Sequence, residues 1–123
     1  MADSKDMVDM DQPVFDYDDF LRRIDGDVEL LSEVIGIFLE DTLALLAELI
    51  SGIKSKNAVV VDRAAHTLKG AAANISAKRL YLLCQRLQTL ARKDEGADWD
   101  SLILHLEKNF SDLDHALRDY LTK

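Results

Sequence analysis

The chain has 123 residues, a formal net charge of −8 and one cysteine, and 48% of its residues are apolar. This length and composition are typical of one globular domain, and a single cysteine excludes an internal disulfide. No apolar stretch approaches the roughly 18 residues that a membrane span requires, and the N-terminus lacks the regions of a signal peptide. We therefore predict a cytoplasmic protein that does not bind a membrane.

Positive charge is concentrated in the middle of this acidic chain. Residues 62–93 hold seven basic side chains and one acidic side chain, a net charge of +6, whereas residues 1–61 and 94–123 carry −9 and −5. A segment of this kind attracts a small anion or an acidic protein surface. The acidic flanks would repel a long phosphate backbone, so a nucleic acid is not an expected partner.

The first half of the chain predicts a tail and two helices. Residues 1–12 are predicted to be a disordered tail, and residues 13–123 the domain. A short helix is predicted near Asp16, where Asp16, Asp18 and Asp19 suit its N-terminal end. A long helix is predicted after Asp27 and is expected to end at Ser51-Gly52. Its core stripe repeats every three or four residues: Val28, Leu31, Ile35, Phe38, Thr42, Leu45 and Leu49.

The second half predicts three more helices. They are expected over Ala58–Asn74 after Asn57, over Ala77–Lys93 after Ser76, and from Trp99 onward after Asp98. The last has a core stripe of Trp99, Leu102, Leu106, Phe110, Leu113, Leu117 and Tyr120. Four long amphipathic helices with short connections predict an all-α fold, an antiparallel four-helix bundle with a short additional N-terminal helix.

The helix Ala58–Asn74 carries an unusual histidine. At roughly 100° per residue, its core stripe is Val61, Ala65, Leu68, Ala72 and Ile75. His66 lies about 140° from that stripe. The histidine shares its own stripe with small or apolar residues: Val59, Gly70, Ala73 and Ala77. A solvated helix face normally carries long polar side chains instead, so this face is predicted to receive another protein.

Two neighbours of His66 support a chemical role for it. Gly70 costs about 1 kcal/mol relative to alanine inside a helix, and it lies one turn after His66, where it clears space. Lys69 lies three residues after His66, so its ammonium can reach an anion bound at the imidazole. An imidazole nitrogen can attack phosphorus. These residues therefore predict a phosphoryl group on His66 that is stabilised by Lys69.

The next helix is expected to flank this histidine. Its polar stripe, beside the core leucines, consists of Tyr81, Gln85, Gln88 and Arg92. In an antiparallel hairpin, a glutamine of this stripe is predicted to hydrogen-bond one ring nitrogen of His66. The predicted partner-binding residues are Gly70, Ala73, Ala77, Gln88, Arg92, Gln85 and Arg63.

The run His66–Ile75, HTLKGAAANI, resembles the signature of histidine-containing phosphotransfer (HPt) domains, a His followed by Lys-Gly and small residues. Residues 79–92 are similar to the next helix of that family. The resemblance implies a four-helix bundle with His66 as phosphoacceptor, Lys69 neutralising the phosphoryl group and Gly70 admitting the partner. It implies that Gln88 hydrogen-bonds the ring and that Arg92 is a basic residue near it, with Gln85 as the alternative to Gln88. Ser76 departs from the glycine that the family often has there; a serine can cap the next helix, which leaves the shape of this turn open.

The resemblance implies a phosphocarrier of a two-component phosphorelay, without kinase activity of its own. His66 would accept a phosphoryl group from a receiver-domain aspartate and pass it to another receiver. The implied partners are response-regulator receiver domains and a hybrid sensor kinase, with Mg²⁺ on the receiver partner only. The chain itself is expected to need no cofactor or metal, since it has no glycine-rich phosphate loop. It is expected to be a monomer.

Two alternatives stay open: a helical adaptor that binds receiver-like proteins without phosphotransfer, and a phosphoacceptor domain for a histidine kinase acting in trans. The other histidines, His105 and His115, fall away from the last core stripe and are predicted to be surface residues. The three histidines show no metal-binding spacing. Cys84 is predicted to be a small buried apolar residue and not a nucleophile.

Overall fold

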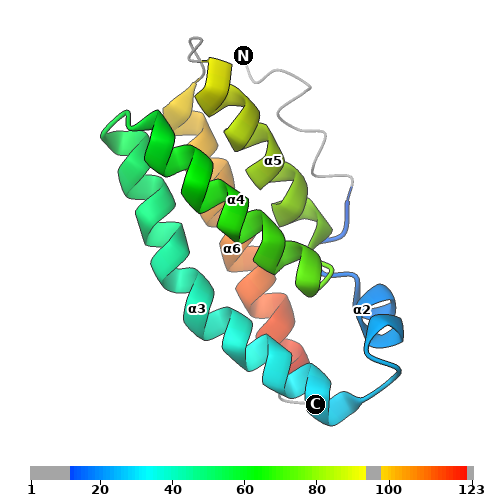
Figure 1. Cartoon of the computed structure of the whole chain (residues 1–123). Helices are drawn as coiled ribbons and strands as arrows, with labels where there is room; N and C mark the ends of the chain where they lie inside the picture. Colours follow the sequence, from blue (N-terminus) through cyan, green and yellow to red (C-terminus); the bar gives the residue numbers. More distant parts are fainter. Residues whose placement is uncertain (1–11, 94–97, 122–123) are drawn as a thin grey trace.

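The computed structural model describes residues 12–93 and 98–121, and over these residues it holds five α-helices and no strand. They are α2 (Tyr17–Arg23), α3 (Val28–Lys54), α4 (Ala58–Asn74), α5 (Lys78–Lys93) and α6 (Trp99–Leu121). The four long helices run alongside one another with alternating direction, and α2 lies at one end of the bundle (Figure 1). The predicted all-α bundle with a short N-terminal helix is confirmed, whereas the predicted tail lies almost wholly outside the described residues.

Side-chain caps explain where the helices begin. An N-cap oxygen accepts a hydrogen bond from a backbone N–H that has no partner inside the helix. Such bonds join Asp16 to Asp19, Asp27 to Leu30, Asn57 to Val60 and Asp98 to Ser101, with lengths of 3.1, 3.0, 3.2 and 3.1 Å. Four of the five predicted helix starts are therefore confirmed, and the fifth helix, α5, begins at Lys78, one residue after the predicted Ala77.

The predicted end of the first long helix is wrong, because α3 continues through Ser51-Gly52 to Lys54. Gly52 is buried where α3 packs on α4, and a Cβ there would lie 2.8 Å from Cγ1 of Val60. This glycine permits close packing of two helices and does not stop one of them. The predicted stripe of α3 is buried except at two positions. Leu45 is half-buried, and Val28 is 61% exposed because it occupies the first position of the helix, at the end of the bundle.

Two glycines of α3 form a matched pair for testing this packing. Apart from its chain neighbours and the nearby backbone of its own helix, no described atom lies within 4 Å of a Cβ built on Gly36, so Gly36→Ala should raise the free energy of unfolding by about 0.5–1 kcal/mol. Gly52→Ala should lose this gain, because Val60 must move to admit the methyl group. Urea denaturation of both variants measures the difference. Equal gains at the two positions would contradict the close approach of α3 and α4.

The turn between α4 and α5 is held by α2. Ser76 has a φ of 59°, in the left-handed region that favours glycine. Its hydroxyl donates to Oδ2 of Asp19 at 2.7 Å and accepts from Nη1 of Arg23 at 3.3 Å, both on α2. The side chain of Ser76 is thus directed to α2 and does not cap α5, while its backbone takes the shape that a glycine would adopt.

The acidic cluster at the start of α2 has a structural role. Asp16 caps α2 and also binds Nζ of Lys78 at 2.9 Å, and Asp19 binds Ser76. The hydrogen bond from Lys78 holds the pKa of Asp16 below its usual value, and the bond from Ser76 does the same for the pKa of Asp19. The predicted capping role is confirmed for Asp16, while Asp18 and Asp19 lie in the first turn of α2, where negative charge suits the helix dipole. None of the described helices is both long and apolar enough to cross a membrane.

Candidate functional site

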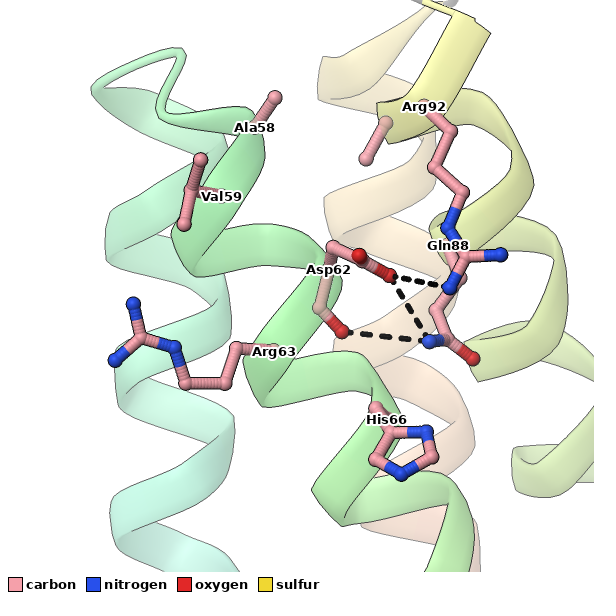
Figure 2. A pocket seen from close by; sticks show the side chains of 8 residues that line it. Ala58, Val59, Asp62, Arg63, His66, Gln88 and Arg92 are labelled. Carbon is pink, nitrogen blue, oxygen red and sulfur yellow. Dashed lines mark hydrogen bonds and ion pairs between the residues drawn. The ribbon is translucent and has the colours of Figure 1, made fainter.

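His66 lies on the face of α4 that points away from the core. The predicted core stripe of this helix, from Val61 to Ile75, is buried, and Leu68 is completely inaccessible, whereas His66 is exposed. The ring lines a pocket of about 550 Å³ between α4 and α5 (Figure 2). The other residues that line this pocket are Ala58, Val59, Asp62, Arg63, Gln88, Ala91 and Arg92.

Gln88 and Arg92 reach this pocket as predicted, but their side chains bind Asp62. Oδ1 of Asp62 accepts from Nε2 of Gln88 at 3.0 Å, and it lies 3.2 Å from Nη2 of Arg92. Within residues 12–93 and 98–121, nothing hydrogen-bonds to the ring of His66, so the predicted bond from Gln88 to that ring is absent from this structure. A carboxylate is a stronger acceptor than a neutral ring nitrogen. Gln88 is only 4% exposed, so its amide takes the stronger partner.

Asp62 is the residue of this site that the sequence analysis did not identify. The hydrogen bond from Gln88, then the hydrogen bond and charge of Arg92, and last the charge of His66 hold the pKa of Asp62 below its usual value. Asp62 is therefore ionised at neutral pH. Two signals in the sequence point to it: it is the one acidic residue in the basic segment 62–93, and it lies one helical turn before His66.

Lys69 and Gly70 lie beside His66 in different ways. Lys69 is half-buried, and its Nζ lies 6.0 Å from the ring centroid of Tyr81 on α5, in cation–π range. Gly70 is exposed, and apart from its chain neighbours and the nearby backbone of α4, no described atom lies within 4 Å of a Cβ built on it. Nothing in the described fold therefore requires a glycine at this position, in contrast to the packed Gly52.

Of the remaining predicted partner-binding residues, three are at least partly exposed and one is buried. Arg63 is exposed and lines the pocket, Ala73 is half-buried further along α4, and Gln85 is exposed but does not line the pocket. Ala77 is fully buried, so its predicted place on a docking face is wrong. The reason is that α4 ends at Asn74, so the helical spacing that placed Ala77 beside His66 does not continue to it.

The other candidate groups lie elsewhere. His105 is half-buried and His115 is exposed, both on α6, and Cys84 is buried as predicted. In the part of the chain that the structure describes, no group of three or more His, Cys, Asp or Glu side chains is arranged to hold a metal ion.

Comparisons with known proteins agree with this geometry. The family model described as "Hpt domain" matches residues 33–118, a range that contains α4, α5 and the pocket. The fold is similar to the crystal structure of histidine-containing phosphotransfer protein B (HptB) from Pseudomonas aeruginosa PAO1, with a TM-score of 0.81 and 21% sequence identity. That similarity covers 89% of this chain and 96% of the other. A comparison with curated protein sequences gives no significant match.

Proposed function

The chain belongs to the Hpt domain family, phosphocarrier modules that work with receiver domains in phosphorelays, and from this we propose that His66 carries its phosphoryl group. His66 would accept the group from the aspartate of one receiver domain and pass it to the aspartate of another. We place the chain between a hybrid sensor kinase and a response regulator, as a cytoplasmic monomer.

The observation that carries the proposal is the setting of His66 on α4. The helix is anchored by a fully buried face, so the opposite face presents the imidazole at a fixed place on the surface. Beside the ring, Gly70 leaves open space that no packing inside the described fold explains. A side chain that must be reached by another protein's active site requires this combination of rigid support and clear approach.

The transfer step needs little from the chain besides the ring. The imidazole nitrogen that bears the lone pair attacks phosphorus, and the bond from phosphorus to the aspartyl oxygen breaks. The aspartate leaves as a carboxylate with the bonding electrons, and the ring keeps the proton on its other nitrogen. The phosphohistidine then reverses these steps with the second receiver. Under this proposal Mg²⁺ is held by the receiver.

The surface around the ring suits such a partner. We define the docking face as His66 with Val59, Arg63, Gly70 and Ala73, all on α4. Val59 is 67% exposed and supplies an apolar contact, and Arg63 adds positive charge toward an acidic partner surface. Lys69 can leave the ring of Tyr81 and bind the phosphoryl oxygens, because a cation–π contact of this kind is weak beside a charge-assisted hydrogen bond.

Peptide mapping of a labelled chain tests the proposal directly. The chain is incubated with a receiver domain phosphorylated with labelled phosphate, digested with trypsin at alkaline pH, and its peptides are separated. Trypsin cleaves after Arg63 and Lys69, so the peptide 64–69 contains His66, while His105 and His115 fall in the peptides 94–108 and 109–118. We expect acid-labile, base-stable label on the peptide 64–69 and its chase onto a second receiver.

The same experiment separates the two alternatives. Binding of the receiver without any labelled peptide would identify an adaptor. Label on the peptide 64–69 that appears only with a histidine kinase and ATP would identify an acceptor for a kinase in trans. Label on either of the other histidine peptides would overturn the assignment of His66.

A further inference from the structure

We infer that Asp62 limits how tightly His66 holds its phosphoryl group, because Asp62 binds Arg92 in competition with that group. The inference rests on the proposed function of His66 and assigns a positioning role to a residue that does not itself touch phosphorus. The feature that carries it is the shared carboxylate between α4 and α5.

The geometry puts the three partners within reach of one another. Asp62 and His66 are four residues apart on α4, so they are neighbours on the helix surface. Their side chains extend from successive turns of α4 toward α5, and the guanidinium of Arg92 approaches Asp62 from the last turn of α5 (Figure 2). A phosphoryl group on the ring would thus lie in the same pocket as the carboxylate and the guanidinium.

Gln88 and Arg92, the two side chains that bind Asp62, differ in how firmly they are held. Gln88 is almost wholly buried and donates to Asp62 from below the surface, which fixes the carboxylate in place. The side chain of Arg92 is 66% exposed and ends in a 3.2 Å ion pair with Asp62. An ion pair this exposed to solvent is weak and exchanges easily. Arg92 is therefore the mobile member of the cluster.

Phosphorylation of His66 would offer Arg92 a second anion. A phosphoryl group carries more negative charge than a carboxylate and can accept two parallel hydrogen bonds from a guanidinium. The ionised Asp62 opposes this exchange in two ways, since it retains part of the Arg92 population and repels the phosphoryl oxygens. Both effects make the phosphohistidine less stable relative to the free histidine, which favours onward transfer from a carrier.

The test is the position of the transfer equilibrium in a double-mutant cycle. Wild type, Asp62→Asn, Arg92→Gln and the double variant are each equilibrated with one phosphorylated receiver, and label on the peptide 64–69 is measured. The amide oxygen introduced by Asp62→Asn would still accept from Gln88 but would no longer hold Arg92 by charge. Release of one exposed ion pair should shift the equilibrium toward phosphohistidine about three-fold and lengthen its half-life similarly.

Arg92→Gln should shift the equilibrium the other way, and the Asp62→Asn gain should shrink in the double variant to the part that comes from removing the repulsion. An equal gain with and without Arg92 would overturn the competition, and no gain in Asp62→Asn would overturn the role of Asp62 altogether. Circular dichroism and thermal midpoints of the four proteins exclude a folding effect. Wild type that takes no label on the peptide 64–69 would instead overturn the proposed function itself.

Discussion

Replacement of His66 by glutamine should abolish acid-labile labelling by a phosphorylated receiver, a loss of about 1,000-fold or more in transfer rate. Glutamine keeps a polar side chain of similar reach, but its amide nitrogen is not a nucleophile. The loss should appear at the chemical step, because the rest of the docking face stays in place. Single-turnover transfer from a labelled receiver measures the rate, and co-sedimentation with the unphosphorylated receiver measures binding.

The same variant should fold normally. His66 is exposed, and no described residue hydrogen-bonds to its ring, so the free energy of unfolding should change by less than about 0.5 kcal/mol. His105→Gln and His115→Gln serve as matched controls on α6 and should retain full labelling. Undiminished label on His66→Gln would show that another residue is the acceptor.

Filling the space at Gly70 should stabilise the fold and slow transfer at the same time. Since a Cβ at this position meets nothing inside the described fold, Gly70→Ala should raise the free energy of unfolding by about 0.5–1 kcal/mol. Gly70→Gln places a long side chain one turn from His66, where the partner must approach. We expect a loss of about 10-fold or more in transfer, expressed mainly as weaker binding of the receiver.

Gly36 provides the control for this prediction. It lies inside α3 with the same open surroundings and far along the chain from the docking face. Gly36→Ala and Gly36→Gln should reproduce the stabilisation without the loss of transfer. If Gly70→Gln transferred at the wild-type rate, the open space would have no part in docking. If Gly70→Ala instead unfolded more easily, the glycine would serve the fold.

Local signals predicted most of this fold. The starts of the helices follow from single capping side chains such as Asp27 and Asn57, which act within three residues of themselves. The buried stripes follow from helical spacing, and they fix the outward direction of His66 on the opposite face of α4. The resemblance in residues 66–75 then pointed to the family that the whole-domain match shows.

Two of the errors, those at Gly52 and Gln88, arose where a second helix decides the outcome. Gly52 was expected to end its helix, but its structural role is to let Val60 of α4 pack closely against α3. Gln88 was expected to hydrogen-bond to the ring of His66. In the folded hairpin its amide can also reach the carboxylate of Asp62, which is the stronger acceptor, and it donates to that carboxylate. Helical spacing shows which residues share a face of one helix, but it does not show which residues of two different helices contact each other.

The left-handed turn at Ser76 has a consequence for the size of the minimal folding unit. The family match begins at residue 33, beyond the end of α2 at Arg23. Yet Ser76 is 3% exposed, and its hydroxyl bonds to Asp19 and Arg23, while Arg23 also donates to the carbonyl oxygen of Ala73 in the last turn of the histidine helix. A chain trimmed to residues 33–118 would lose α2 and these hydrogen bonds to the turn, which contribute about 0.5–1.5 kcal/mol each. We therefore expect the smallest part of the chain that folds fully to begin before residue 33, where the family match begins, and to include α2. A chain without α2 should lose rigidity first at the C-terminal end of α4.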